Sequence, residues 1–290
     1  MLNRQKAIIE LLTRAGRPVT HIQLTKLCFL LRHEYETHGG NAFYDFVPYK
    51  FGPFSFALFQ EVGKLVDQGY IEEPSSKSWS ISETVKADTS RLDKHVKSDI
   101  DELLEKFGKL SKNKLIDRVY GSHPRFTINS EIRKLESHPK AKKAVFTAGY
   151  EGLSIDAFLD MLSRNGVKRI VDVRSNPIAR RYGFHKSTLN RLSGNLGIDY
   201  KHVPELGIHS ELRQNLEDQS DYNRLFDRYE KTTLATSETA IDTVAQYCLE
   251  KPSVLVCMER EPCSCHRGRL APFVSEKLGL PIEHLMPDVN

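Results

Sequence analysis

Residues 254–269 read VLVCMEREPCSCHRGR. An apolar run at residues 254–256 leads into Cys257, and a polar loop follows as far as Ser264. Residues 265–267, Cys-His-Arg, then open a segment of helical character. A buried strand, a loop and a helix in this order are typical of an α/β sheet, where ligands bind at the carboxyl ends of the strands. The stretch therefore predicts a fold class and also the position of a site.

The rest of the C-terminal half repeats this alternation of strand and helix. Further candidate strands cover residues 144–148, 169–173 and 200–203, and candidate helices cover residues 155–163, 189–196, 222–231 and 241–250. Such alternation favours a Rossmann-like, mainly parallel sheet with helices on both faces. We therefore assign residues 144–290 to a Rossmann-like domain of the α/β class.

Residues 1–137 have a different, mainly α pattern. Apolar side chains at helical spacing predict helices over residues 2–14 and 24–31, with Thr20 as a suitable N-cap before the second. A third helix is expected over residues 55–69, followed by a short hairpin that we expect from residues 70–72 and 79–81. This is the order of a winged-helix-like domain. Residues 138–143, HPKAKK, form the expected linker to the second domain.

A family resemblance supports this division for the N-terminal half. The segments that carry it are residues 22–27, 46–53, 62–65, 69–71 and 115–120, the last followed by His123-Pro124. Together they resemble the Panacea domain, which is similar to small antitoxin-like modules of bacterial and phage chains. The resemblance implies binding or neutralisation of a protein partner, with or without DNA contact, rather than catalysis.

The C-terminal half also resembles a known family. Its four ordered motifs are FTAGYEG (146–152), VDVRSNPIARRYGF (171–184), YKHVPELG (200–207) and CMEREPCSCHR (257–267). They resemble the family named domain of unknown function 488, which implies the fold rather than a reaction. One loop departs from that pattern: Leu206-Gly207 leads to Ile208-His209, where the family usually has a second Gly and then Arg. We therefore expect the loop that faces the substrate to differ.

Composition narrows the class of protein. The 290 residues are 39% hydrophobic and 28% charged, and no apolar run reaches the roughly 18 residues of a membrane span. Arg14 and Arg17 interrupt the apolar residues near the N-terminus, unlike a secretory signal. Five cysteines are an odd number, which favours reduced thiols. We expect a cytoplasmic protein with no membrane partner.

The net charge of +4 is unevenly distributed. Residues 1–143 contain 24 Lys and Arg against 18 Asp and Glu, whereas residues 144–290 contain 18 against 20. A basic N-terminal half suggests a nucleic acid or an acidic protein as partner. An ordinary solvated surface explains the same surplus, so both interpretations stay open.

The expected catalytic residues lie mostly in the opening stretch: Cys257, Glu259, Cys265 and His266, with His202 from a neighbouring strand. A helix start, together with His266 and Arg267, is expected to lower the thiol pKa of Cys265 and favour the nucleophilic thiolate. Cys257, directly after a strand, is the competing nucleophile. Glu259, His266 or His202 would move protons.

Binding residues are expected at the ends of the same strands. The candidates for phosphate or substrate contact are Gly149, Tyr150, Arg174, Arg180, Arg181, Tyr182, Phe184, Glu205 and Arg267. A guanidinium matches phosphate oxygens bidentately, and aromatic rings stack on bases. The alternatives for Arg174, Arg180 and Arg181 are ordinary surface charge or an ion pair with Asp172 or Glu205. For Asp172 an internal pair with an arginine is the first interpretation, because an unpaired buried carboxylate is costly.

Zinc is an alternative for the same stretch. Cys257, Cys263, Cys265 and His266 are suitable ligand types, but the spacing C-x5-C-x-C-H matches no standard zinc finger or ribbon. We therefore assign no metal and no cofactor, and we interpret Cys263 as an incidental surface thiol.

Taken together, the sequence predicts an enzyme directed at a nucleotide or nucleic acid, in bacterial or phage defence or in DNA processing. The N-terminal domain would bring a protein partner. A non-catalytic regulator, antitoxin-like or sensor-like, that binds nucleic acid or another ligand is the first alternative. A zinc-stabilised binding domain is the second.

Overall fold

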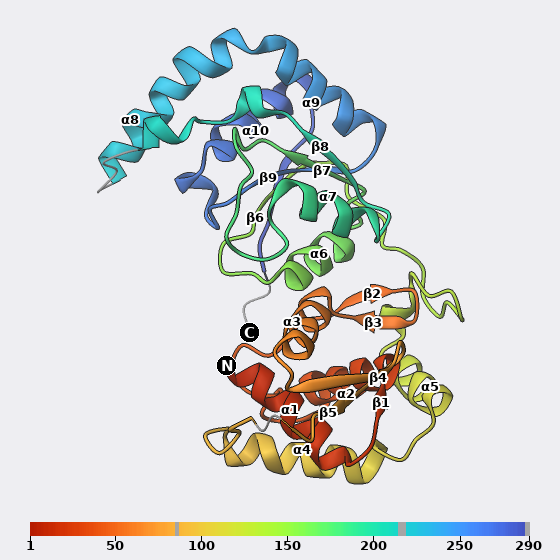
Figure 1. Ribbon diagram of the computed structural model, residues 1–290. Helices are drawn as coiled ribbons and strands as arrows, with labels where there is room; N and C mark the ends of the chain where they lie inside the picture. The colour runs from red at the N-terminus through yellow and green to blue at the C-terminus, as the bar shows by residue number, and fades with distance from the viewer. Residues whose placement is uncertain (85–86, 214–218, 288–290) are drawn as a thin grey trace. The chain divides into compact units, whose positions relative to one another are not determined.

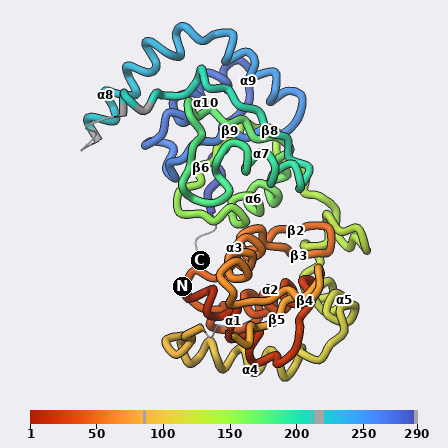
Figure 2. Tube along the Cα trace, in the orientation of Figure 1, coloured from red at the N-terminus to blue at the C-terminus, as the bar shows by residue number. Residues whose placement is uncertain are grey.

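The computed structural model describes residues 1–84, 87–213 and 219–287. The chain separates into two compact units, Met1–Ser137 and His138–Asn290, and each is described by itself (Figures 1 and 2). The first is mainly helical and the second is built on a parallel sheet, so the α/β fold class expected from the sequence is confirmed.

Helices dominate the N-terminal unit. They are α1 (Asn3–Ala15), α2 (His21–Glu34), α3 (Phe56–Asp67), α4 (Lys94–Phe107) and α5 (Lys112–Ser122), with a 3-10 turn η1 (Pro124–Thr127). The strands β1 (Val19–Thr20), β5 (Ser78–Ile81) and β4 (Ile71–Ser75) form an antiparallel sheet in that order, and β2 (Val47–Tyr49) pairs with β3 (Gly52–Phe54). The β4–β5 hairpin follows α3, as the winged-helix order requires.

Helix α2 forms the centre of this unit. Leu24, Leu27 and Leu30 are at most 1% exposed, and every residue from Gln23 to Leu31 is buried, so the helix is enclosed on nearly every side. Thr20 caps its start, as expected: Thr20 Oγ1 accepts from the backbone N–H of Gln23, and Gln23 Oε1 accepts from the backbone N–H of Thr20.

Lys26 is a charged exception in this apolar core. Its side chain is 1% exposed and donates to the carbonyls of Phe51 and Pro53, in the turn and strand that follow β2. Burial lowers the pKa of Lys26 from 10.5 to about 7, because the ammonium form loses its hydration.

The C-terminal unit alternates strand and helix. Its strands are β6 (Val145–Gly149), β7 (Arg169–Asp172), β8 (Asp199–His202), β9 (Ser253–Cys257) and β10 (Ile282–Leu285). Its helices are α6 (Ile155–Arg164), α7 (Lys186–Gly194), α8 (Gln219–Tyr229), α9 (Glu238–Glu250) and α10 (His266–Leu278). Shorter helical turns are η2 (Pro204–Leu206), η3 (Ser210–Arg213), the π-helical η4 (Glu230–Leu234) and η5 (Pro262–Ser264).

The strands form a parallel sheet in the order β10-β6-β9-β7-β8. Helices α6 and α7 lie on one face and α8 to α10 on the other (Figure 1). The first strand of the unit, β6, therefore lies between the fourth and the fifth, whereas dinucleotide-binding sheets place it between the second and the fourth. This order puts β9, and the loop that leaves it, in the middle of the carboxyl edge.

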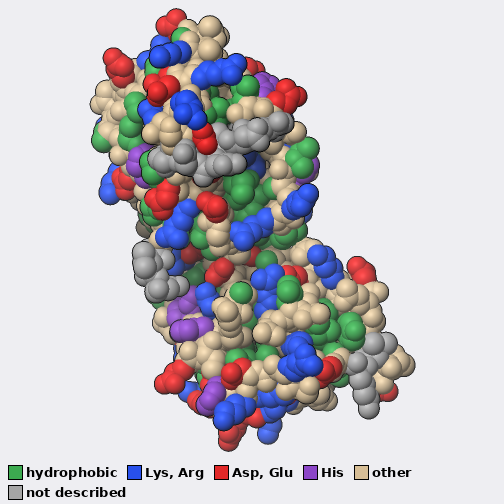
Figure 3. Space-filling model, turned by 90° about the vertical axis from the view of Figure 1, so that its left-hand side faces the viewer, with side chains coloured by type: hydrophobic (Ala, Val, Ile, Leu, Met, Phe, Trp, Pro, Cys, Tyr) green, Lys and Arg blue, Asp and Glu red, His purple; other side chains and the backbone are tan. Residues whose placement is uncertain are grey.

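Positively and negatively charged side chains are both present on the surface. On the face drawn in Figure 3, acidic and basic groups are interspersed in both units. Among the described residues, no helix is both long enough and apolar enough to cross a membrane.

The buried Lys26 predicts a pH-dependent stability. Between pH 7 and pH 9 the unfolded chain keeps a proton that the folded chain releases, so the free energy of unfolding rises with pH. The expected rise is about 2 kcal/mol larger in the wild type than in Lys26→Met. Urea titrations followed by fluorescence test this, because Trp79, the chain's one tryptophan, is buried in this unit. Equal pH slopes in the two proteins would contradict a neutral Lys26.

Candidate functional site

The parallel register brings the expected strand ends to one edge. Gly149 pairs with Cys257, and Asp172 lies level with Val256 on one side and His202 on the other. Because residues alternate between the two faces, the polar groups here divide into two sets. The side chain of Cys257 lies on the face covered by α10, and that of Asp172 lies on the face covered by α6 and α7.

Four reactive side chains meet on the α10 side, and we call them the strand-end cluster: Cys257, Glu259, Cys265 and His266. One donor atom from each lies within 4.8 Å of the others. Cys257 Sγ is 3.1 Å from Glu259 Oε2 and 3.5 Å from His266 Nδ1. Both cysteines and His266 are at most 1% exposed, whereas Glu259 is half-buried. All four were expected site residues, and the structure brings them together.

The tautomer of His266 follows from its surroundings. Its Nε2 lies 2.9 Å from the carbonyl of Val173, which can only accept, so Nε2 carries the proton. In the neutral ring, Nδ1 is then an acceptor that faces the thiol of Cys257. A Tyr229 ring packs edge-on against the imidazole and helps to hold its orientation.

Cys265 differs from its expected chemistry. It is the residue before α10, as expected, but its side chain is enclosed. Burial, and then the neighbouring Cys257 thiol, raise the pKa of Cys265 well above the usual value, so the expected lowering by the helix start is wrong. Cys263 is exposed and lies outside the cluster, and Glu259 occupies the place that the zinc alternative gave to it.

The loop that carries Glu259 is pressed onto the end of β6. A Cβ on Gly149 would lie 1.8 Å from the carbonyl oxygen of Glu259, so only glycine fits there. Glu151 binds the same loop twice: its N–H donates to the Met258 carbonyl, and its carboxylate accepts from the N–H of Arg260. Glu151 was not among the expected site residues, although it lies within the FTAGYEG motif.

Arg267 binds the backbone of the same loop from the protein interior. Its guanidinium is fully buried and donates to the carbonyls of Glu259 (2.5 Å) and Arg260 (2.7 Å). The guanidinium of Arg267 therefore holds the loop and is not available for the expected phosphate contact. Its Nε has no hydrogen-bond partner among the residues that the structure describes.

Arg174 is likewise an internal residue. It is 5% exposed and binds both carboxylate oxygens of Asp172, at 2.8 and 2.5 Å, which is the ion pair that the sequence analysis kept as an alternative. Its Nη1 donates to the hydroxyl of Tyr150 and the carbonyl of Phe184. Tyr200, which sequence reasoning missed, donates to the same Asp172 carboxylate. These groups form hydrogen bonds with one another inside the protein, so none of them is available to bind a phosphate.

The aromatic candidates pack inward. The rings of Tyr150 and Phe184 stack on each other with centroids 4.1 Å apart, and both side chains are buried. They therefore present no open ring face to a base. Burial raises the pKa of Tyr182, which is half-buried.

Exposed arginines surround the turn at residues 150–153. Arg181 donates to the carbonyl of Leu153, and Arg260 is anchored through its backbone to Glu151. Arg180 is exposed beside Arg181. Arg260 was not among the expected binding residues, although its place directly after Glu259 was the available signal.

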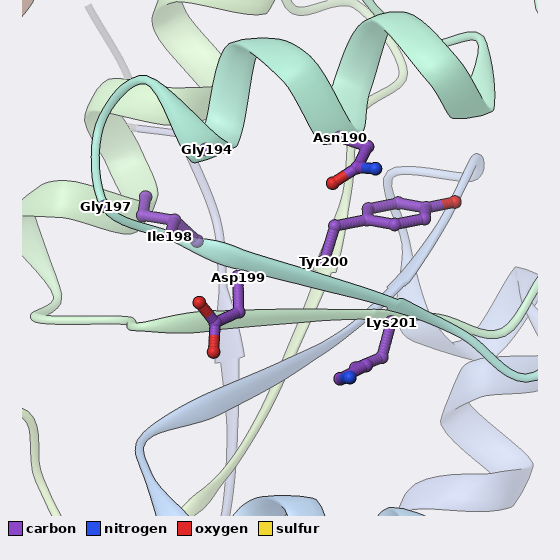
Figure 4. A pocket seen from close by; sticks show the side chains of 7 residues that line it. All are labelled: Asn190, Gly194, Gly197, Ile198, Asp199, Tyr200 and Lys201. Carbon is purple, nitrogen blue, oxygen red and sulfur yellow. The ribbon is translucent and has the colours of Figure 1, made fainter.

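The two remaining candidates lie apart from the cluster. His202 donates from Nε2 to the Arg174 carbonyl, and Lys186 donates to its Nδ1. Glu205 is exposed in η2. A hollow of about 380 Å³ does occur near here, on edge strand β8 and the end of α7. Figure 4 shows its lining: Asn190, Gly194, Gly197, Ile198, Asp199, Tyr200 and Lys201. It includes no strand-end cluster residue.

Residues 154–274 match the family described as Domain of unknown function DUF488. The matched segment includes Arg174 and the whole strand-end cluster, and it confirms the resemblance expected for the C-terminal half. No curated protein and no solved structure matches the chain. The Panacea resemblance of residues 1–137 stays a prediction.

The close approach at Gly149 can be tested with Gly149→Ala. The added methyl must push away the loop of Glu259, so we expect a loss of about 1–3 kcal/mol of stability and faster modification of the buried thiols of Cys257 and Cys265. Gly194→Ala is the matched control, because nothing lies within 4 Å of its added Cβ. Wild-type stability and thiol reactivity in Gly149→Ala would show that the loop does not depend on this contact.

The Asp172–Arg174 pair predicts a second effect on stability. Asp172→Asn keeps the side-chain shape but leaves the Arg174 guanidinium buried without its carboxylate, so we expect a loss of about 3–5 kcal/mol. The control Asp242→Asn removes an exposed partner of Lys277 and is expected to cost about 1 kcal/mol or less. Urea unfolding followed by circular dichroism measures both. Equal losses would contradict a special role for the buried pair.

Proposed function

We propose that the C-terminal unit is an enzyme that acts on a nucleotide or nucleic acid, with the strand-end cluster as its reactive centre. The observation that carries the proposal is the convergence of two thiols, a carboxylate and an imidazole within 4.8 Å at the carboxyl edge of a parallel sheet. Ligands of open α/β sheets bind at this edge. A role in defence or DNA processing, with a protein partner held by the N-terminal unit, is part of the proposal.

The arrangement of proton donors and acceptors supports a reactive centre. His266 Nδ1 is positioned to accept a proton from Cys257, and Glu259 offers a second acceptor on the same sulfur. Glu259 is half-buried, so it is the member of the cluster that solvent or a substrate reaches first.

Phosphate recognition is assigned to the exposed arginines rather than to Arg174. Arg181 contacts the turn at residues 150–153 through its guanidinium and Arg260 through its backbone N–H, and Arg180 precedes Arg181 in the sequence. This turn leaves β6, whose last residue pairs with Cys257. A phosphate held there would bring the rest of a nucleotide to the loop that covers the cluster.

A binding module without turnover is the second candidate. It is favoured by the burial of Cys257, Cys265 and His266 and by the contacts that hold the loop of Glu259 in place. In this case the exposed arginines would still bind the ligand, and the cluster would support the fold.

Binding and turnover measurements separate these functions. We expect the full chain to bind labelled DNA, RNA or nucleotides with an affinity that falls as salt rises. In Arg181→Gln and Arg260→Gln the salt slope should fall by about one each, since each loses one phosphate contact. Arg224→Gln, on exposed α8, is the matched control. Unchanged binding in both site variants would refute the phosphate assignment.

Chromatography of the same mixtures tests catalysis. Product that forms with the wild type and is lost in Cys257→Ser and Glu259→Gln would support the enzyme. Tight binding with no product from any of these ligands would favour the binding module instead.

A further inference from the structure

We propose that Cys257, Glu259, Cys265 and His266 bind a zinc ion. The inference goes beyond the enzymatic proposal, because it concerns what holds the cluster together. With zinc bound, Cys257 and His266 are ligands rather than a nucleophile and its base, so zinc binding is an alternative use of the same side chains. The inference also revises the sequence-based alternative, since Glu259 takes the place of Cys263.

The spacing of the donor atoms suits a small tetrahedral ion. Bonds of about 2.0–2.3 Å in a zinc tetrahedron place neighbouring donors about 3.3–3.8 Å apart. Cys257 Sγ lies 3.1 Å from Glu259 Oε2 and 3.5 Å from His266 Nδ1, and the whole set lies within 4.8 Å. The widest separation would have to shorten by about 1 Å to give zinc geometry, which small side-chain rotations can supply.

The donor types select the metal. Two thiols and an imidazole favour zinc over magnesium or calcium, which require oxygen ligands. The ligands come from the end of β9, its loop and the start of α10, so the ion would join the central strand to the helix that covers it.

The orientation of His266 is the one that a metal ligand needs. Its Nε2 donates to the Val173 carbonyl at 2.9 Å, which leaves the Nδ1 lone pair directed at the cluster. Metal-binding histidines almost always donate their other ring N–H to a carbonyl or carboxylate in this way. The same bond would fix the tautomer and the orientation of the imidazole for coordination through Nδ1.

The charges of the cluster residues also favour a bound cation. Two thiolates and a carboxylate around one point repel one another, and a divalent cation among them leaves a net charge of −1. The guanidinium of Arg267 is fully buried beside this loop and donates to the carbonyls of Glu259 and Arg260. A buried charge is costly without a counter-charge, and the zinc centre with its ligands supplies one.

Metal content of the purified full chain is the direct test. We expect one zinc per chain by elemental analysis, and a fall of about tenfold or more in Cys257→Ser and Cys265→Ser, each of which loses a ligand. Cys263→Ser is the matched control and should keep its zinc, because Cys263 is exposed and outside the cluster. Glu259→Gln should bind zinc more weakly but retain the sulfur ligands.

Cobalt substitution covers the case in which a cysteine variant fails to fold. The wild-type chain loaded with Co²⁺ should show the absorption of tetrahedral thiolate coordination, and stoichiometric Zn²⁺ should abolish it. A wild-type chain that contains less than about 0.1 zinc per chain after dialysis against Zn²⁺, and that shows no such cobalt spectrum, overturns the inference. Because neither measurement needs a substrate, stoichiometric zinc without turnover would leave this inference intact and refute only the enzymatic proposal.

Discussion

The contact between Gly149 and the carbonyl of Glu259 is the constraint on which the candidate site depends. It lets the loop after β9 lie directly on the end of β6, where any larger residue would collide with the backbone. Glu151 and Arg267 then hold the loop from both sides. Only with the loop in this place does Glu259 reach the two cysteines and His266.

The end of β7 links the two polar networks of this edge. The carbonyl of Val173 accepts from His266 on the α10 side, and that of the next residue, Arg174, accepts from His202 on the other. Hydrogen-bond donors and acceptors are thus paired on both faces of the sheet, and the low dielectric of the interior strengthens these hydrogen bonds. The Asp172–Arg174 pair serves the fold, while the reactive groups gather where β9 ends.

Much of the fold was predictable because periodicity is a local property. The apolar spacing of α2, the Thr20 cap and the strand–helix alternation of residues 144–257 all appear in the structure. Helix α4 was missed although Val96, Ile100, Leu103 and Phe107 carry a helical pattern. Strand β10 gave a weaker signal, because it is a short edge strand that is only partly buried.

The sequence by itself determined that reactive residues follow the ends of buried strands, since this depends only on the order of residue types. Which of them meet was decided by tertiary structure. The order β10-β6-β9-β7-β8 and the alternation of side chains placed Cys257 and Asp172 on opposite faces. Burial then determined the chemistry. It raises the pKa of Cys265, although the position of this residue at a helix start predicts a lower pKa. It also encloses Arg174 and Arg267, and the sequence pattern alone does not distinguish buried arginines from surface arginines.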